Sequence, residues 1–381
     1  MRLLAGEVLL GRTPGIAFFS TTMSSVTSPI VTMQVQVKNY ISILQSRIIA
    51  ALESLDASPD AARFLNDTWQ RAEGGYGQSS VLSGGTHIEK AGVNISVVYG
   101  KLPPAAIKQM RADHEGLPWS EGSSTSLPFF AAGLSLVIHP RRPEAPTVHA
   151  NYRYFEITEE SEQRETLVAG DERNPGKILA WWFGGGSDLT PSYLFPSDAQ
   201  HFHGTLKAAC DPYGDALYPA FKKWCDEYFY IPHRKECRGI GGIFFDDLSE
   251  HNHKRLAGGR PKTRDDIWAF VRSCGDAFVP SYLPILKRRI APGEGPEKPL
   301  EESEERKRRW QLLRRGRYVE FNLVYDRGTK FGLMTPGARI ESILMSLPET
   351  ARWEYCSELG NEEGTREKEL VDVLMSPRNW A

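Results

Sequence analysis

The stretch VHANYRYFE, residues 148–156, alternates in character along its length and indicates how the chain folds. In a β-strand successive side chains point to opposite faces, so His149, Asn151 and Arg153 would share one face. The opposite face would carry Tyr152, Tyr154 and Glu156. Buried parallel strands are continuously apolar instead of alternating. The stretch therefore predicts an antiparallel strand with one polar face.

Other segments extend this prediction to the whole chain. Runs rich in β-branched and aromatic residues predict further strands at 93–99, 134–139, 178–183, 240–245 and 318–325. Apolar residues at helical spacing predict helices at 35–55, 105–111, 199–209, 216–230, 264–290 and 301–315. Residues 318–324 alternate strictly and support the same type of sheet. The expected fold is α+β, a broad, largely antiparallel sheet flanked on both faces by helices in a single domain.

Composition limits the classes of function. The 381 residues carry 46 basic and 48 acidic side chains, so no global field would attract nucleic acid. Five cysteines without a C-x-x-C pair are expected to be reduced thiols. No run approaches the roughly 18 apolar residues of a membrane span. Residues 1–33 predict either a transit-like segment or a disordered extension before a catalytic domain at 34–381, and 158–174 and 291–299 predict surface loops.

The stretch WWFGGGSDLTP, residues 181–191, leads from an apolar strand into three glycines. Such a run permits tight turns and the close approach of a flat ligand to the backbone. Asp188 is expected on a turn at the end of the strand, either as a helix cap or as a site residue. Because no Gly-Lys-Ser/Thr follows, the glycines do not form a nucleotide-binding loop.

The polar face of residues 148–156 is either exposed to solvent or lines a cleft. Three polar side chains would be costly to bury in an apolar core, which favours a cleft. Ser135 and His139 would share a face of the neighbouring strand. Arg153 suggests an acidic substrate, because guanidinium binds carboxylate through two hydrogen bonds. Arg141 and Arg142 are better explained as a solvated turn.

Three other charged segments allow a structural or a functional interpretation. The charges of 301–315 predict a solvated helix face, and Asp246 with Asp247 predicts a solvated acidic turn. The residues Gly337, Ala338 and Arg339 begin a predicted helix, which is either an ordinary helix start or a carboxylate site. Nine histidines lack any H-E-x-x-H spacing, so a required metal is not expected.

Five separated segments together resemble one enzyme family. They are EKAGVN at 89–94, VHANYRYFE, WWFGGGSDLTP, KKWCDEYFYIPHRKECRGIGGIFFD at 222–246, and GRYVEFNLVYDRGTKFGL at 316–333 followed by RIESILMSLP. In this order they resemble the oxygen-dependent coproporphyrinogen III oxidases, over nearly the whole chain from about residue 41. The resemblance implies a broad antiparallel sheet flanked by helices, in agreement with the strand pattern.

The resemblance also implies a reaction. Two propionates of coproporphyrinogen III would become vinyl groups with release of carbon dioxide and hydrogen peroxide, giving protoporphyrinogen IX. Molecular oxygen would be the co-substrate, and neither a metal nor an organic cofactor is expected. The resemblance further implies a homodimer through residues 318–355. The expected location is cytoplasmic in the broad sense, either the cytosol or the mitochondrial intermembrane space.

Individual roles follow from matching positions. His149 matches the family's proton donor, and Asp188 matches the acid that engages the pyrrole N–H groups. The matched substrate-binding positions are Ser135, Asn151, Tyr152, Arg153, Gly337, Ala338 and Arg339. Histidines that bind metal in some bacterial members match His139, His149, His201 and His233. The alternatives are a non-catalytic tetrapyrrole carrier and a metal-dependent oxygenase or hydrolase.

Overall fold

The computed structural model describes residues 31–72, 74–111, 117, 125–160, 177–256, 258–291, 300–334 and 338–381. Residues Thr32–Ala381 form one compact unit. The predicted extension at 1–33 lies outside the described residues as far as residue 30, as do most of the predicted loops at 158–174 and 291–299.

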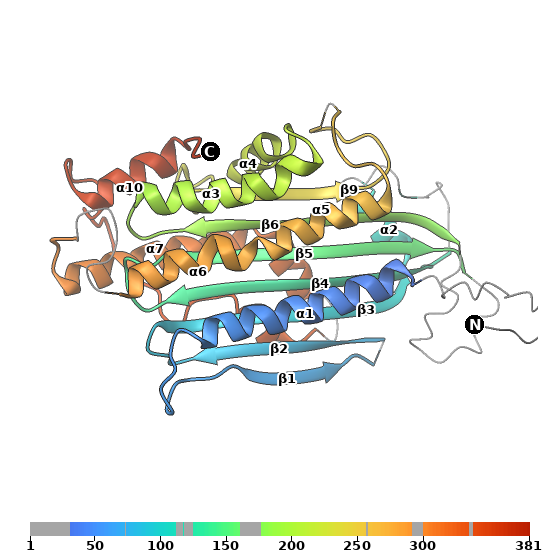
Figure 1. The fold of residues 1–381 in the computed structure, drawn as a ribbon, viewed down its shortest axis with the longest axis horizontal. Coiled ribbons are helices and arrows are strands. Elements are labelled where there is room, and N and C mark those ends of the chain that lie inside the picture. The colour runs from blue at the N-terminus through green and yellow to red at the C-terminus, as the bar shows by residue number, and fades with distance from the viewer. Residues whose placement is uncertain are drawn as a thin grey trace, which may run out of the picture. The chain divides into compact units, whose positions relative to one another are not determined.

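A seven-stranded sheet in which every neighbouring pair is antiparallel forms the centre of this unit (Figure 1). The strand order is β1-β2-β3-β4-β5-β6-β9. The strands are β1 (Leu65–Gln70), β2 (Gly75–Ser83), β3 (Ile88–Leu102), β4 (Leu127–Pro140), β5 (Thr147–Thr158), β6 (Ile178–Thr190) and β9 (Gly242–Leu248). Each strand from β2 to β6 neighbours the strand before it in sequence. The predicted antiparallel sheet is confirmed.

One face of the sheet lies under a layer of helices that crosses it in Figure 1. This layer contains α1 (Met33–Glu53), α3 (Pro196–Cys210), α5 (Arg264–Asp276) and α6 (Phe278–Ile290). The Thr32 side chain caps α1 by accepting from the backbone N–H of Val35. Leu134 and Leu136 of β4 are completely buried beneath this layer. The main apolar core therefore lies between these helices and the sheet.

The described residues cover the opposite face only in part. Figure 1 shows α7 (Glu304–Val324) behind the sheet. Two shorter helices follow it, α8 (Arg327–Met334) and α9 (Ile340–Leu344). At the far end, α2 (Pro104–Met110) packs near Phe155 and Trp182. Helices on both faces confirm the predicted α+β arrangement, and the uncovered part of this second face exposes polar side chains of the central strands.

Two predicted elements are wrong. The segment 264–290 is two helices instead of one, because Pro280 in the first turn of α6 has no N–H to donate to the preceding turn. The segment 318–325 is not a strand but the end of α7. Its buried residues Tyr318, Phe321 and Asn322 have the i, i+3, i+4 spacing of a helix, and that face packs inward.

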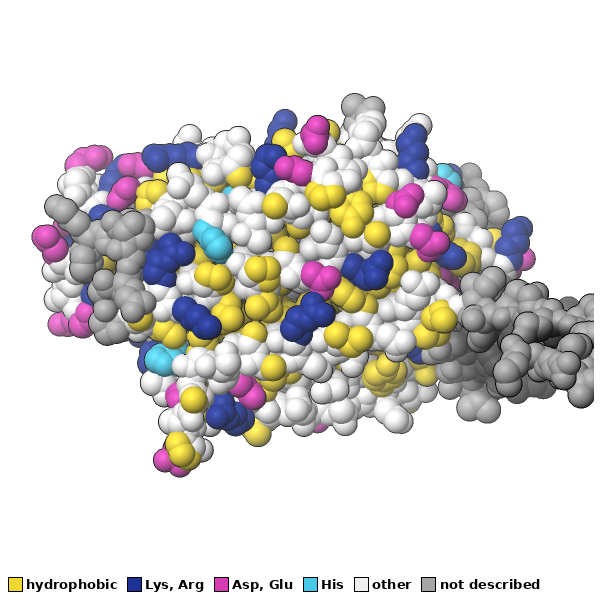
Figure 2. All heavy atoms as spheres, viewed as in Figure 1, with side chains coloured by type: hydrophobic (Ala, Val, Ile, Leu, Met, Phe, Trp, Pro, Cys, Tyr) yellow, Lys and Arg dark blue, Asp and Glu magenta, His cyan; other side chains and the backbone are white. Residues whose placement is uncertain are grey.

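Several elements were not predicted. They are β1, β2, the small hairpin of β7 (Tyr230–Ile231) and β8 (Glu236–Cys237), the 3-10 turn Asp211–Tyr213, α8, and α10 (Arg366–Met375). The predicted helix at 216–230 is α4 (Leu217–Tyr228). All five cysteines are free thiols, four of them buried. Within the described residues no helix has the length and apolar character needed to cross a membrane. Acidic and basic side chains intermingle on the helical side (Figure 2).

Candidate active site

The uncovered face of the sheet brings the predicted polar residues of β5 together. His149, Asn151 and Arg153 are each half-buried on this face, as the alternation predicts. Asn151 pairs in register with Ser135 of β4, and His149 pairs with Asp188 of β6. Antiparallel neighbours have side chains about 5 Å apart on a shared face. Strand register thus assembles the group from three separate segments.

A buried carboxylate links His149 to Arg238. Oδ1 of Asp188 lies 2.7 Å from Nδ1 of His149, and Oδ2 lies 2.7 Å from Nη2 of Arg238. The side chains of Asp188 and Arg238 are 3% and 2% exposed. Arg238 also donates to Oδ1 of Asn322 at 2.9 Å and lies over the ring of Phe229, 4.0 Å from its centroid. These contacts run from Arg238 through Asp188 to the half-buried imidazole of His149.

The charge state of Asp188 follows from these partners. Burial by itself would raise the pKa of the Asp188 carboxyl, but the charges and hydrogen bonds of Arg238 and His149 outweigh it, and the pKa lies below its ordinary value. An ionised carboxylate only accepts hydrogen bonds, so Nδ1 of His149 must donate to Asp188. Nε2 of His149 makes no hydrogen bond with any of the described residues, and is available to exchange a proton with a ligand.

Arg238 was not singled out from the sequence. It lies in the segment 222–246 that carried the family resemblance, but nothing in the local pattern distinguishes it from the other basic residues there. Its contact depends on the residue after β8 being brought to β6, since Arg238 and Asp188 are 50 residues apart in sequence. Only the contact with Asp188 identifies it.

Arg153 lies beside the contacts of Asp188 with its partners, and two side chains hold it in place. Its Nη1 donates to Oδ1 of Asn151 at 3.0 Å, and its Nη2 lies 2.9 Å from Oδ1 of Asp246. Asp246 is 8% exposed within β9, so the prediction of a solvated acidic turn is wrong for this residue. The carboxylate is buried because the Arg153 guanidinium offsets its charge.

The glycines of β6 have a different function from the one predicted. Gly184, Gly186 and Asp188 lie inside β6, not on a turn. A Cβ at Gly184 would lie 2.6 Å from Asp246 Oδ1, and one at Gly186 would lie 2.3 Å from the Ile243 carbonyl oxygen. The glycines therefore make room for the Arg153–Asp246 pair and for close packing of β9.

Tyr152 does not share this face. Its side chain is 2% exposed among the covering helices, and its hydroxyl donates to the carbonyl oxygen of Cys274 at 2.9 Å. The alternation of β5 requires this, because Tyr152 lies between Asn151 and Arg153. The Tyr152 side chain therefore lies on the opposite face of the sheet from His149 and Arg153, and only its backbone adjoins them.

The predicted carboxylate site at 337–339 is only partly described. Gly337 lies outside the described residues, and Ala338 is half-buried just before α9. Arg339 is the N-cap residue of α9 and forms an ion pair with Asp67 of β1. The helix docks on the polar face through Asn94, whose Nδ2 donates to the carbonyl oxygen of Ser342 at 3.0 Å. Arg339 thus borders the same face as His149.

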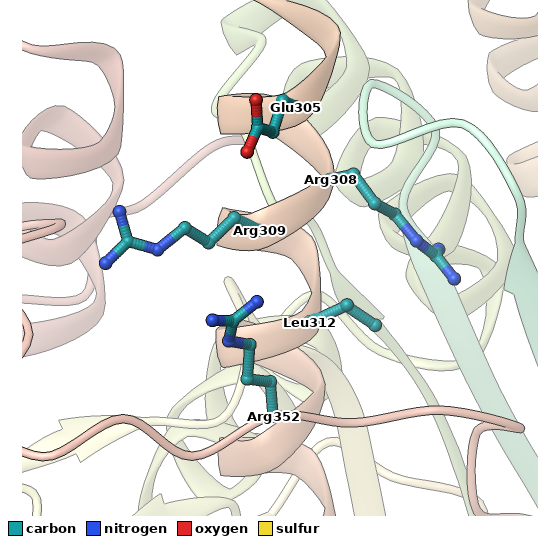
Figure 3. Close-up of a pocket in the computed structure, with 5 residues that line it drawn as sticks. All are labelled: Glu305, Arg308, Arg309, Leu312 and Arg352. Atoms are coloured by element: carbon teal, nitrogen blue, oxygen red, sulfur yellow. The ribbon is translucent and has the colours of Figure 1, made fainter.

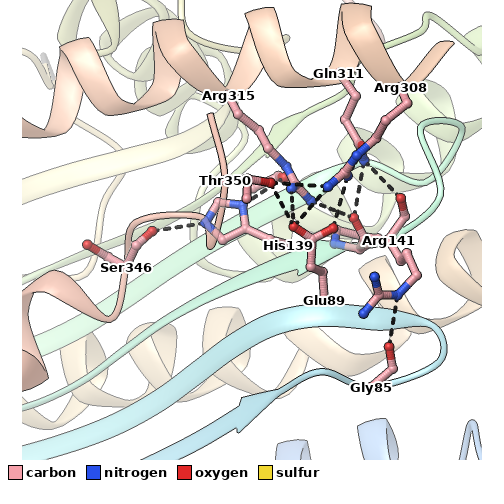
Figure 4. A network of polar contacts seen from close by, with 11 residues as sticks. Gly85, Glu89, His139, Arg141, Arg308, Gln311, Arg315, Ser346 and Thr350 are labelled. Carbon is pink, nitrogen blue, oxygen red and sulfur yellow. Dashed lines mark hydrogen bonds and ion pairs between the residues drawn. The ribbon is translucent and has the colours of Figure 1, made fainter. Parts of the chain in front are cut away.

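A buried ionic network fastens α7 to the sheet (Figure 4). Glu89 of β3, 2% exposed, accepts from Nη1 of Arg315 at 2.6 Å and pairs with Nη1 of Arg308 at 2.9 Å. Thr350 also donates to Glu89, at 3.2 Å. Lys307, Arg314 and Arg315 are each at most 5% exposed. The prediction of a solvated charged face is therefore wrong for the inner side of this helix.

The four histidines matched to a metal site do not gather. Nε2 of His139 lies 3.0 Å from the Ser346 carbonyl oxygen, Nε2 of His201 lies 2.9 Å from that of Pro280, and Nε2 of His233 lies 2.6 Å from Glu320 Oε2. Burial, with the charge of Arg315, lowers the pKa of His139 to about 3. No group of three or more His, Cys, Asp or Glu side chains in the described part of the chain is arranged to hold a metal ion. These four side chains do not fit one shared metal.

The described part of the chain has two hollows of note, of which one borders the site. One of about 620 Å³ adjoins Arg153 through Asp246 and is also lined by Trp182, Trp224 and Arg327. The other, of about 410 Å³, lies on α7 among the residues of Figure 3. Arg308 there pairs with Glu89, and Arg309 and Arg352 both pair with Glu354. Because these arginines already have carboxylate partners, the hollow on α7 offers no unpaired guanidinium to a ligand. The hollow beside Asp246 is therefore the better candidate for a part of the substrate site.

A family model described as coproporphyrinogen III oxidase matches residues 36–380. The chain belongs to the coproporphyrinogen III oxidase family. It is 50% identical over 336 residues to the human mitochondrial oxygen-dependent coproporphyrinogen-III oxidase, covering 88% of this chain and 64% of that protein. Identity to the oxygen-dependent coproporphyrinogen-III oxidase of Drosophila melanogaster is 51%, covering 88% of this chain and 75% of the fly protein.

The similarity extends to plants. The chloroplastic coproporphyrinogen-III oxidase 1 of Arabidopsis thaliana is 46% identical over 361 residues, which is 95% of this chain and 81% of that protein. The matched region contains all five segments that suggested the family. Membership in the coproporphyrinogen III oxidase family confirms that resemblance.

Proposed function

We propose that the chain is an oxygen-dependent coproporphyrinogen III oxidase of haem and porphyrin biosynthesis. Each of two propionates would lose carbon dioxide and a hydride equivalent, leaving a vinyl group. Oxygen would accept that hydride with one proton and become hydrogen peroxide. The observation that carries this proposal is the buried chain of Arg238, Asp188 and His149 beside Arg153 on one open sheet face.

The geometry suggests a separate role in proton transfer for Asp188 and for His149. Asp188 is 2% exposed and each of its oxygens already accepts a hydrogen bond, so we infer that it acts through His149 instead of contacting a pyrrole directly. His149 is 22% exposed and would be the group that exchanges a proton with the substrate. Asp188 would set its tautomer and stabilise its protonated form, as a buried partner of a catalytic histidine does.

The remaining residues of the face would bind the substrate. Arg153 and Arg339 offer guanidinium groups to propionates, in the two-hydrogen-bond geometry that carboxylates favour. Ser135 and Asn151 lie side by side between the strands and supply polar contacts. We propose that this chemistry needs oxygen and no metal or organic cofactor.

Product formation by the full-length, chelator-treated protein would test this function. Coproporphyrinogen III would be supplied in air and, separately, without oxygen, and protoporphyrinogen IX and hydrogen peroxide would be measured. The expected result is turnover in air that disappears without oxygen. Turnover in air only after a divalent metal is restored would contradict the cofactor-free reaction, and binding without turnover under any condition would indicate a tetrapyrrole carrier.

We also propose a homodimer through residues 318–355. Thirteen large apolar side chains are exposed among the described residues, and seven of them lie in this region. They are Leu323, Val324, Leu333, Met334, Ile340, Trp353 and Tyr355. Exposed apolar side chains concentrated in one region are typical of an interaction surface. Their concentration on α7, α8, α9 and the following segment supports contact with a second copy.

Sedimentation equilibrium would test the dimer. The wild-type protein should have twice the 42.8 kDa mass of one chain. The double variant Met334→Asp, Tyr355→Asp should sediment as a monomer, because it places two charges in the apolar surface. Met375→Asp is the matched control, since Met375 is 57% exposed outside this region and its substitution should leave the dimer intact.

The compartment is a separate proposal. We infer the cytosol or the mitochondrial intermembrane space. The human relative is named mitochondrial and the Arabidopsis relative chloroplastic. Protease protection of the tagged full chain in fractionated cells would distinguish the two proposed locations, and protection inside the innermost membrane of an organelle would contradict both.

A further inference from the structure

The Arg339 guanidinium is paired with a carboxylate of the protein itself. Asp67 of the edge strand β1 is its partner, and the two side chains are 40% and 49% exposed. An edge strand has no neighbour on its outer side, so water can reach this pair. A carboxylate is also the group that Arg339 would bind in the substrate. The inference below rests on the oxidase function proposed above.

Strand register places Asp67 in the same row as the substrate-binding residues. Asp67 pairs with Ser79, Ser79 with Asn94, Asn94 with Ser135, and Ser135 with Asn151. Four strand spacings of about 4.8 Å separate the backbone of Asp67 from that of Asn151, or roughly 19 Å. The Asp67 carboxylate therefore lies at the outer edge of the polar face on which the substrate would lie.

Helix α9 fixes Arg339 above that edge. Oγ of Ser342 lies 2.7 Å from Oγ of Ser79, and its carbonyl oxygen accepts from Nδ2 of Asn94 at 3.0 Å. Ser342 is three residues after Arg339, so these contacts hold the helix over β2 and β3 while the guanidinium extends to β1. A change of partner by Arg339 would then require movement of side chains only.

The other substrate arginine is held in a different way. Arg153 contacts Asn151 and the buried carboxylate of Asp246, which is 8% exposed. Releasing a buried carboxylate from its cation is strongly unfavourable. Releasing Asp67 costs little, because its carboxylate is already half-exposed and would be rehydrated. The pair at Arg339 is therefore suited to exchange, and the pair at Arg153 to permanent positioning.

We propose that Asp67 is a positioning residue that competes with the substrate for Arg339. Its carboxylate holds the guanidinium at the edge of the polar face until a substrate propionate replaces it. One carboxylate is exchanged for another, so the net charge at Arg339 does not change on binding. The competition weakens substrate binding and contributes nothing to the chemical step.

Kinetics of Asp67→Asn would test the competition. The variant keeps the size of the side chain and removes the charge. Because an exposed ion pair is weak, KM for coproporphyrinogen III should fall by about two- to five-fold, with kcat within about two-fold of wild type. The matched control is Asp276→Asn, which removes a half-exposed aspartate paired with Arg47 on the helical side and should leave KM unchanged.

The double variant separates competition from other effects. Arg339→Ala should raise KM, and adding Asp67→Asn to it should give no further change, because the competition needs the guanidinium. An unchanged or higher KM in Asp67→Asn would overturn the proposal, and so would an equal effect with and without Arg339. Absence of turnover in the wild type would instead contradict the oxidase function. Binding of coproporphyrin III, followed by fluorescence, would then show separately whether Asp67→Asn tightens binding.

Discussion

Asp188 is stable as a buried carboxylate because each of its oxygens contacts a cation or a proton donor. His149 and Arg238 both lie 2.7 Å from it, and losing the Arg238 contact would leave two opposite charges unpaired in a nearly dry environment. Arg238 needs Asp188 equally, since aromatic rings surround the rest of its guanidinium. At this scale stability and the proposed proton exchange depend on the same contacts.

Asp188→Asn should therefore lower both the stability of the fold and the rate of the reaction. The amide leaves Arg238 without its counter-charge, and the free energy of unfolding should fall by about 3 kcal/mol, as for a broken buried ion pair. The His149 tautomer and its protonated form lose their support, and kcat should fall by about 10²-fold or more. Chemical unfolding and turnover of coproporphyrinogen III measure these effects.

Ser187→Ala is the matched control for this substitution. Its hydroxyl is buried next to Asp188 in sequence, and within the described residues it has no hydrogen-bond partner. Removing it should change stability and kcat only slightly. A wild-type kcat in Asp188→Asn, with the fold intact, would show that the carboxylate takes no part in the reaction.

Strand β6 shows how one element serves both the sheet and the site. Most strands lose stability when they contain glycine, because glycine has no side chain to pack. Here the missing side chains are what allow β9 to pack closely and the Arg153–Asp246 pair to fit across Gly184. The unusual composition of the strand follows from its position between two crowded neighbours.

Gly186→Ala should disturb this element. The new Cβ would lie 2.3 Å from the backbone oxygen of Ile243, so β6 and β9 would have to separate locally. Overpacking of this kind costs about 1–3 kcal/mol, and it should shift Asp188, two residues further on, enough to lower kcat. Thermal unfolding and steady-state kinetics would detect both changes.

Gly204→Ala makes the same chemical change in α3. Outside its own helix backbone, no described atom lies within 4 Å of the place that the new methyl group would take. Because alanine also favours helix, stability should stay equal or rise by about 0.5–1 kcal/mol. Equal destabilisation by the two substitutions would refute the packing argument.

The whole molecule depends on α7 being fastened to the sheet. Glu89 of β3 contacts Arg308 and Arg315 of α7 and Thr350 of the segment after α9 (Figure 4). The same helix supplies Asn322, which contacts Arg238. A substitution in β3 therefore reaches the site through the position of the helix.

Glu89→Gln should lower the free energy of unfolding by about 3–5 kcal/mol, because it leaves two guanidinium groups near a neutral amide. Denaturant unfolding followed by tryptophan fluorescence would measure the loss. Glu305→Gln, on the exposed side of α7, should change stability by no more than about 0.5 kcal/mol. Similar losses in both variants would mean that the network contributes nothing specific.

Acid should destabilise the molecule through Glu320. Burial by itself would raise the pKa of Glu320, but the hydrogen bonds from Arg234, His233 and Trp353 outweigh it and lower the pKa to about 2, from an ordinary value of 4.5. A group with a lower pKa in the folded state stabilises the fold above its unfolded value, and this stability is lost as the pH falls from about 4.5 towards 2. Tm should therefore decrease across that interval.

Comparison of Glu320→Gln with the wild type would test whether Glu320 causes this decrease in Tm. The variant should have a lower Tm than the wild type at pH 7, and the difference should narrow progressively below pH 4.5, where the wild type loses the same interaction. Differential scanning calorimetry between pH 7 and pH 3 would measure it. A constant difference over that interval would contradict the assigned direction of the pKa shift.

Local patterns determined a large part of this description. The alternation of residues 148–156 placed His149, Asn151 and Arg153 on one face, and the structure confirms that placement. The glycine run predicted a turn and the close approach of a flat ligand, but the residues lie in a strand, and the groups that approach them closely are β9 and the Arg153–Asp246 pair. Side-chain direction depends only on local backbone geometry, which is why short stretches of sequence determine it.

The sequence by itself determined the antiparallel sheet, the polar face of β5 and the family. Tertiary structure alone decided that 318–324 are helical. The segment alternates as a strand would, yet its residues Tyr318, Phe321 and Asn322 also have helical spacing. Packing against the rest of the fold selects the helix over the strand. Tertiary structure alone also decided that Arg238 meets Asp188 and that Arg315 meets Glu89, 226 residues away. Periodicity acts between near neighbours in sequence, whereas the pairing of buried charges depends on which distant segments the folded chain brings together.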